Sequence, residues 1–163
     1  IGVRLVGSEM CIRDRTNTMH KVAPEIEAAI DIPLLHIADA TAHRLQADGV
    51  TRVGLLGTRF TMEQDFYKGR LQERFGLEVL VPDDAARERV HRIIYDELCL
   101  GDIRESSQAE YLAIIADLAQ TGAQAVILGC TEIALLVGAC QAAVPLYDTT
   151  AIHAEAAVTL ALA

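Results

Sequence analysis

Residues 125–136 read AVILGCTEIALL, and this stretch decides the fold. Its first four residues are all apolar, which is typical of a strand buried on both faces of a parallel sheet. Gly129 interrupts the apolar run, and the residues after it are compatible with a helix. We therefore expect a strand, a turn that carries Cys130, and then a helix.

Cys130 is the candidate reactive group of this turn. Unpaired backbone N–H groups and the positive end of the helix dipole gather at a helix start. This environment favours the thiolate, which is the reactive form of cysteine. The sequence therefore predicts a lowered pKa for Cys130, whereas Cys99 falls in the interior of a predicted helix and should react slowly. The alternative is a buried structural cysteine, which is the commonest fate of a free thiol.

Strands and helices alternate along the rest of the chain. The predicted strands are residues 33–37, 53–57, 77–81, 125–128 and 144–147, and the predicted helices are residues 22–30, 38–47, 61–75, 84–100, 107–118 and 148 to the end. Thr61 with Gln64 and Ser107 with Glu110 have the spacing of capping boxes, and Gly101 suits a helix end. This alternation implies right-handed crossovers and a parallel sheet covered on both faces, so the predicted fold class is α/β.

Composition excludes several functional classes. The 163 residues carry a formal net charge of -9, which makes a nucleic-acid partner unexpected because a phosphate backbone requires a basic face. No apolar run approaches a membrane span and no signal-peptide pattern is present, so no membrane partner is expected. The four cysteines, Cys11, Cys99, Cys130 and Cys140, have no paired spacing, which indicates neither disulfides nor a zinc site. We therefore expect a cytoplasmic protein.

The first 15 residues, IGVRLVGSEMCIRDR, have neither helical nor strand periodicity. The part LVGSEMCIRDR resembles the translation of a sequencing-library adapter. We therefore expect residues 1–15 to be a non-native segment joined to the natural chain at Thr16. The alternative is an ordinary strand at residues 1–6 followed by a charged loop.

Small polar residues follow three segments that should meet at one edge of the sheet. They are Asn17 and Thr18, then Thr58 and Thr61, and then Cys130, Thr131 and Glu132. Ligands of open parallel sheets bind outside the carboxyl ends of the strands, where these groups could hold a carboxylate. Helix capping is the alternative for the two threonines at 58 and 61, and a plain turn for residues 17–18. His153, on the last predicted helix, is a further candidate for the lining of the site.

The sequence contains no signature of a nucleotide or metal site. Neither the dinucleotide-binding glycine motif nor the P-loop motif occurs, which argues against a nucleotide cofactor. The five histidines lack metal-ligand spacing, so no metal is expected. We expect no cofactor.

Four motifs resemble the aspartate/glutamate racemase family. They are TNTMHK at residues 16–21, LLGTRFTMEQDFY at 55–67, GCTEIALL at 129–136 and YDTTAIHAEAAV at 147–158. The chain is most similar to the bacterial broad-range amino-acid racemases. The resemblance implies two similar α/β domains with the active site between them, a homodimer, an amino-acid substrate and no pyridoxal phosphate. It also implies that two cysteines on opposite sides of the α-carbon remove and return its proton, which requires acid/base groups suited to the working pH.

By this resemblance, Cys130 is the second of the two cysteines, and the first falls at position 15, where this chain has Arg15. The positions that hold the substrate's carboxylate and ammonium groups match Asn17, Thr18, Thr58, Thr61 and Thr131, and Glu132 lies beside the second thiol. The resemblance also implies that part of the first domain is absent, which predicts an inactive chain. Residues 16–50 and 140–163 would belong to the first domain, and residues 51–139 to the second.

The substrate and two other functions stay open. Relatives that prefer acidic amino acids carry a lysine shortly before the glycine of the stretch IIYDELCLG, residues 93–101, which has none here. The missing cation favours a broad or neutral substrate range, with aspartate and glutamate still open. The other functions are maleate isomerisation or arylmalonate decarboxylation on the same scaffold, and a non-catalytic binding module, which Arg15 would favour. The Asn-Thr and GCTE motifs favour racemisation.

Overall fold

The computed structural model describes residues 12–13 and 16–162. Cys11, Arg15 and most of the segment expected to be non-native lie outside the described residues. The interpretation of residues 1–15 therefore stays a prediction.

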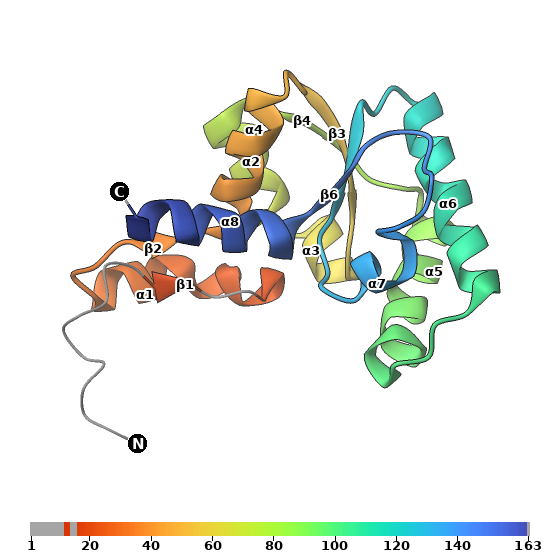
Figure 1. Ribbon diagram of the computed structural model, residues 1–163, viewed down its shortest axis with the longest axis horizontal. Helices are drawn as coiled ribbons and strands as arrows, with labels where there is room; N and C mark the ends of the chain where they lie inside the picture. Colours follow the sequence, from red (N-terminus) through yellow and green to blue (C-terminus); the bar gives the residue numbers. More distant parts are fainter. Residues whose placement is uncertain (1–11, 14–15, 163) are drawn as a thin grey trace.

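Four parallel strands form the central sheet, in the order β4-β3-β5-β6 (Figure 1). Their bounds are Arg52–Leu56 for β3, Glu78–Leu80 for β4, Ala125–Leu128 for β5 and Leu146–Asp148 for β6. All four residues of β5 are buried, as its unbroken apolar run predicts. Leu128 pairs with both Leu56 and Asp148, so three strands end at the same level. The predicted α/β class with a parallel sheet is confirmed.

Helices cover both faces of this sheet (Figure 1). One face carries α2 (Ile37–Ala47), α4 (Lys68–Phe75) and α8 (Thr149–Leu162), and the other carries α5 (Asp84–Asp96) and α6 (Glu105–Gln120). Two short helices, α3 (Arg59–Glu63) and α7 (Ile133–Val137), follow β3 and β5 directly. They therefore lie at the carboxyl edge of the strands.

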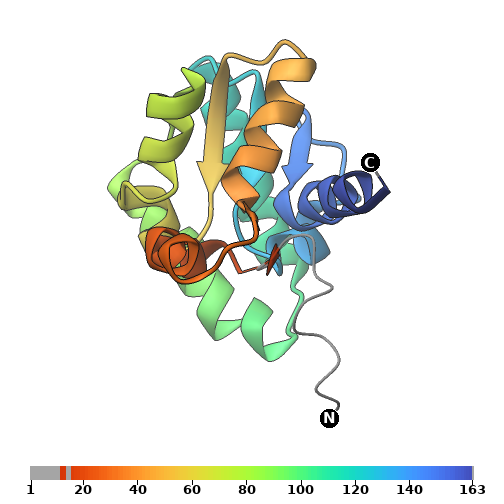
Figure 2. The same ribbon diagram turned by 90° about the vertical axis from the view of Figure 1, so that its left-hand side faces the viewer.

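A smaller region precedes the sheet in sequence. It contains β1 (Ile12–Arg13), the 3₁₀ helix η1 (Asn17–Val22), α1 (Ala23–Ala29) and β2 (Leu34–Leu35). β1 and β2 form a separate parallel pair. Figure 2 shows η1 and α1 at the edge toward which β3 points. β6 pairs with β5, so residues 146–148 share a sheet with β3. The division into residues 16–50 with 140–163 and residues 51–139 stays a prediction.

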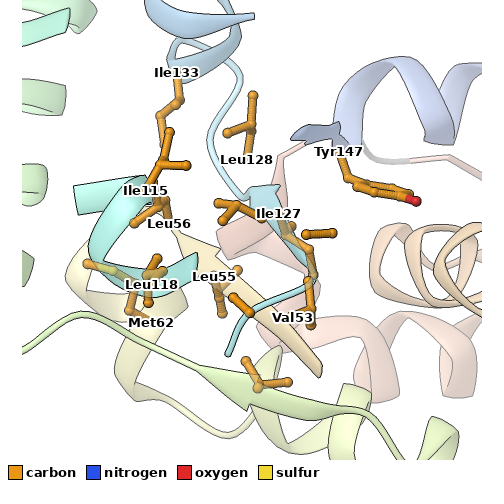
Figure 3. Packing of buried hydrophobic residues seen from close by; sticks show 14 of the residues in the cluster. Val53, Leu55, Leu56, Met62, Ile115, Leu118, Ile127, Leu128, Ile133 and Tyr147 are labelled. Atoms are coloured by element: carbon orange, nitrogen blue, oxygen red, sulfur yellow. The ribbon is translucent and has the colours of Figure 1, made fainter. Parts of the chain in front are cut away.

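The core fills the space between the sheet and its helices. Leu56 of β3 is fully buried on the face of the sheet that α6 covers, where Ile115 and Leu118 of α6 also lie (Figure 3). These side chains come from the apolar stripes that the sequence predicts, so burial of apolar surface holds α6 on the sheet.

The predicted helix 61–75 is two helices, and its capping box is wrong. Thr58 rather than Thr61 caps α3, because the Thr58 Oγ1 accepts a hydrogen bond from the Thr61 N–H at 3.4 Å. Gln64 has an extended backbone and ends α3. The turn that follows buries Tyr67 completely and places Arg70 against α2, where it forms hydrogen bonds of 2.5 and 2.7 Å with Asp39.

The capping box predicted at Ser107 is also wrong. Helix α6 begins at Glu105, and Ser107 lies inside it and donates a hydrogen bond to the Glu97 carboxylate. The preceding helix ends at Asp96 and is followed by the 3₁₀ helix η2 (Leu98–Leu100), which Gly101 ends with a φ of 77°. Cys99 is therefore exposed in η2 and not in a helix interior.

Among the described residues, no helix is long and apolar enough to cross a membrane.

The apolar stripe predicted for residues 22–30 is mostly exposed, because Val22 and Ala29 face solvent and Ile26 and Ile30 are half-buried. The spacing of these apolar residues therefore predicts a buried helix face that no described part of the chain fully covers.

Replacing Ile127 with alanine should destabilise the protein strongly. The side chain lies in the central strand with no exposed surface, and deleting its methyl groups leaves a cavity, which costs about 2–5 kcal/mol. The matched control is Ile103→Ala, since Ile103 is 52% exposed and should change the free energy of unfolding by no more than about 0.5 kcal/mol. Urea denaturation followed by circular dichroism measures both, and equal effects would contradict the packing described here.

Candidate functional site

A cavity of about 220 Å³ opens at the carboxyl edge of the sheet. Residues from four parts of the chain line it: Thr16, Asn17 and Thr18 around the start of η1, Thr58 after β3, Ile94, Tyr95 and Cys99 from α5 and η2, and Gly129, Cys130, Thr131 and Glu132 after β5. The structure thus brings together the candidate residues of the three segments singled out in the sequence. Thr61 and His153 do not line this cavity.

Gly129 brings the ends of β3 and β5 close together. Its backbone N–H donates a hydrogen bond of 2.6 Å to the Leu56 carbonyl oxygen at the end of β3. A Cβ atom on Gly129 would lie only 2.9 Å from that same oxygen, so any larger residue would push the strands apart. The turn after Gly129 therefore places Cys130 directly beyond the sheet edge, next to the residues that follow β3.

The Cys130 thiol is half-buried and donates a hydrogen bond of 2.9 Å to Oε2 of Glu132. Burial raises the pKa of Cys130 from its ordinary value of about 9 to about 12, and the hydrogen bond and negative charge of Glu132 act in the same direction. The Glu132 backbone N–H opposes this shift of the pKa but does not outweigh it.

The predicted lowering of the Cys130 pKa is therefore wrong. Helix α7 begins only at Ile133 and contains five residues, so its dipole is small and starts beyond the thiol. Desolvation and a neighbouring carboxylate outweigh it. Cys99 lines the same cavity, and burial and the charge of Glu132 also raise its pKa.

Thr58 forms part of the cavity wall, and Thr61 lies behind it. Thr58 lines the cavity and caps α3. Thr61 has no exposed surface, and its Oγ1 lies 3.2 Å from the Oγ1 of Thr58. Thr61 therefore supports Thr58 from beneath, and both take part in the helix cap that was the alternative interpretation of this pair.

Asn17 is fixed by a chain of hydrogen bonds to the sheet. Its Nδ2 donates to the Thr149 Oγ1 at 3.1 Å, and the Thr149 hydroxyl donates to the Leu128 carbonyl at 2.9 Å. The Asn17 Oδ1 is buried and accepts no hydrogen bond from the residues that the structure describes. Because buried acceptors are normally satisfied, this oxygen is a candidate partner for an N–H group of a ligand.

The sequence did not identify Thr149, Tyr95 or Cys99 as residues of the site. Thr149 belongs to the motif YDTT, and its position directly after β6 is the signal that could have identified it. Tyr95 and Cys99 reach the cavity because α5 extends past the carboxyl edge of the sheet (Figure 1). Helical periodicity does not specify this direction.

His153 lies elsewhere, so its candidacy for the cavity lining is wrong. The side chain has no exposed surface, and its Nε2 lies 2.8 Å from the Leu35 carbonyl oxygen of β2. In the part of the chain that the structure describes, no three His, Cys, Asp or Glu side chains are arranged to hold a metal ion.

Charge around the cavity is negative. Among the described lining residues, Glu132 is the one with an ionisable carboxylate, and none is a lysine or arginine. A ligand carboxylate would therefore depend on hydroxyl and backbone N–H donors, whereas a ligand ammonium group would find Glu132 and the Asn17 oxygen.

Comparisons with known proteins agree on one family. The Asp/Glu/hydantoin racemase family model matches residues 15–157. The chain is similar to the crystal structure of a putative Asp/Glu racemase from Yersinia pestis, with 58% identity and a TM-score of 0.91 over 94% of this chain and 67% of that one. The structure of an aspartate racemase homologue from Pyrococcus horikoshii is 34% identical, with a TM-score of 0.85. This similarity also covers 94% of this chain and 67% of that one.

A curated relative is the broad specificity amino-acid racemase of Bacillus subtilis. It is 26% identical over 147 residues, which are 90% of this chain and 63% of that protein. The chain thus spans about two thirds of the length of the proteins it matches.

Alkylation of Cys130 should be slow at neutral pH and should rise with pH well beyond the range of an ordinary thiol. The thiolate is the species that reacts, and a pKa of about 12 leaves little of it at neutral pH. Glu132→Gln should lower the pKa and accelerate alkylation, because it removes the negative charge. The measurement is iodoacetamide labelling of the peptide that contains Cys130, followed by mass spectrometry across a pH series.

The matched control is Glu105→Gln, an exposed carboxylate in the first turn of α6 that does not line the cavity. Labelling of Cys130 that levels off at or below about pH 9 in the native protein would contradict the raised pKa.

Proposed function

The chain belongs to the Asp/Glu/hydantoin racemase family, and on this premise we propose that it serves the cofactor-independent racemisation of an amino acid, with Cys130 as one of two acid/base groups. The observation that carries the proposal is the position of the Cys130 thiol. It lies in a cavity beside a carboxylate and is surrounded by the Asn17, Thr58 and Thr131 side chains. A protonated thiol with a proton acceptor at 2.9 Å is suited to giving and taking a proton.

The lining residues support an amino-acid substrate. The Asn17 Oδ1 and the Glu132 carboxylate accept hydrogen bonds from the ammonium group, and the Thr58 and Thr131 hydroxyls donate to the α-carboxylate. These contacts leave the α-carbon facing Cys130. The unpaired acceptor on Asn17 favours this substrate over maleate, which has no N–H group to donate to it.

Glu132 allows the Cys130 thiol both to give a proton to the α-carbon and to remove one from it. When Cys130 returns a proton to the α-carbon, its S–H bond breaks and the thiolate remains. When Cys130 removes the α-proton, its own proton must first leave, and Glu132 is the acceptor already bonded to it. The substrate ammonium group lowers the cost of the thiolate, because an opposite charge nearby favours the ionised form.

The second acid/base group is expected at position 15. We propose that the natural protein has a cysteine there, since a guanidinium is permanently charged and cannot act as a base at neutral pH. Arg15 lies outside the described residues, and the chain as given is expected to be inactive. A homodimer and a cytoplasmic location belong to the same proposal.

The first test is racemisation in deuterated water. The genomic sequence upstream of Thr16 should place a Cys codon directly before it, and the protein translated from that complete reading frame is the one to assay. Starting from a single enantiomer, deuterium should enter mainly the product of opposite hand, because the returning proton comes from a solvent-equilibrated thiol. Cys130→Ser should reduce racemisation by orders of magnitude, since a hydroxyl's pKa lies far above that of a thiol.

Two controls complete this test. The chain with Arg15 should show no conversion, and Cys140→Ser in the complete protein should keep its activity, because Cys140 does not line the cavity. If Cys130→Ser leaves the reaction running while carbonyl-trapping reagents or chelators stop it, the two-thiol mechanism is wrong.

The second test concerns the substrate's side chain. We propose a neutral or broad range, because the described lining contains a carboxylate and no cation. In the complete protein, Cys99→Lys should raise the ratio of kcat/KM for glutamate over a neutral amino acid roughly tenfold, the effect of one added charge-assisted hydrogen bond. Ile103→Lys adds the same charge outside the cavity and should leave the ratio unchanged. A parent enzyme that prefers glutamate would contradict the proposal.

A further inference from the structure

Three buried histidines form a cluster next to the start of η1. The ring centroids of His20 and His36 are 4.4 Å apart, and those of His20 and His153 are 5.9 Å apart. None of the three is more than 3% exposed, and none lines the cavity. His20 lies two residues after Thr18, so this ring is the part of the cluster nearest to the site in sequence.

His20 connects the cavity wall to the first turn of α2. Its Nδ1 lies 3.1 Å from the Thr16 carbonyl oxygen, and its Nε2 accepts a hydrogen bond of 3.2 Å from the Ile37 backbone N–H. The Ile37 group can only donate, so Nε2 must be without a proton. The Thr16 carbonyl can only accept, so Nδ1 must carry the proton. Both bonds therefore form together in one neutral tautomer alone.

The two neighbouring imidazoles restrict the His20 ring further. The His36 Nδ1 accepts from the Ala38 N–H at 3.1 Å and caps α2. Burial, followed by the charge of Arg70, lowers the pKa of His36 from 6.5 to about 3, so its ring is neutral. The His153 Nε2 lies 2.8 Å from the Leu35 carbonyl. Both rings that pack against His20 are therefore held by the backbone.

We propose that His20 is a positioning residue of the racemase site, which holds the backbone of Thr16 so that Asn17 and Thr18 face the cavity. The proposal rests on the proposed function of that cavity. Asn17 is tied on its other side to Thr149 and, through it, to the end of β5. His20 supplies the complementary tie to α2. Together they fix the segment that offers the Asn17 oxygen to the substrate.

Two substitutions separate the two bonds of His20. In His20→Asn, the amide Nδ2 takes the place of Nδ1 and can still donate to the Thr16 carbonyl, whereas the acceptor for Ile37 is lost. In His20→Gln, the amide Oε1 reaches the place of Nε2 and can still accept from Ile37, whereas the donor to Thr16 is lost. Both remove the aromatic ring, so a difference between them reports which of the two hydrogen bonds holds Asn17 in place.

The first readout does not depend on catalysis. The Asn17 side-chain amide gives its own pair of signals in a ¹H–¹⁵N spectrum of the given chain. His20→Gln should move these signals, and His20→Asn should leave them closer to the parent. His43→Asn is the control, because His43 is exposed on α2 outside the cavity. Unchanged Asn17 signals in His20→Gln, or equal changes in both variants, would overturn the proposal.

The second readout is the activity of the complete protein. His20→Gln should lower kcat/KM by up to about 100-fold, as expected when substrate-holding groups are displaced by about 1 Å. His20→Asn should recover part of this loss. If the Asn17 signals move as expected while the parent itself shows no racemisation, the proposed function fails and the positioning role stands.

The third readout needs no variant and applies even if both substitutions prevent folding. A long-range ¹H–¹⁵N spectrum of the parent distinguishes a protonated from an unprotonated ring nitrogen. At neutral pH, His20 should show a protonated Nδ1 and an unprotonated Nε2. The opposite tautomer would break both bonds, and a doubly protonated ring would break the bond to Ile37, so either result would overturn the proposal.

Discussion

The close approach of β3 and β5 at Gly129 is the constraint on which the site depends. The Gly129 N–H and the Leu56 carbonyl are 2.6 Å apart, which leaves no room for a side chain at residue 129. This contact brings the turn that carries Cys130 next to the Thr58 cap. The neighbouring Leu128 carbonyl accepts from Thr149, which in turn binds Asn17. One backbone geometry at the end of β5 thus sets the position of groups from three segments that are distant in sequence.

The environment of Cys130 shows which of two opposing effects is larger. A thiol after a strand and before a helix gains from the helix dipole, but that gain is small for a helix of five residues and falls off within one turn. Burial and the Glu132 carboxylate both favour the neutral thiol, and their sum raises the pKa to about 12. The free protein therefore holds Cys130 as a proton donor. A bound ammonium group changes the charge balance, so the substrate itself is needed to favour the thiolate.

The sequence predicts the elements well where burial alone decides them and poorly where side-chain hydrogen bonds do. The strands at residues 53–57 and 125–128 are long apolar runs, and the structure places them within one residue of their predicted bounds. The caps at Thr61 and Ser107 fail because the spacing of polar residues fits several partners, and tertiary contacts choose among them: Thr61 lies beneath Thr58, and Ser107 donates to Glu97. The gathering of Thr58 and Cys130 follows from the rule for strand ends. Tyr95 and Cys99 line the cavity, and His153 does not. These positions depend on the directions in which the helices run, which hydrophobic periodicity does not specify.

The segment that carries Asn17 and Thr18 belongs to no sheet. It lies in a 3₁₀ helix of six residues, and such short helices have weaker hydrogen-bond geometry than α-helices or ladders. Its position is set instead by buried polar contacts, from Asn17 to Thr149 and from His20 to Thr16 and Ile37. Buried polar networks stabilise little compared with apolar packing, but each wrong arrangement leaves a buried group unpaired and is therefore costly. An apolar contact could hold this segment near the sheet in many orientations, whereas these directional bonds permit one. A site that must present one oxygen to one face of a small substrate requires this directionality more than it requires added stability.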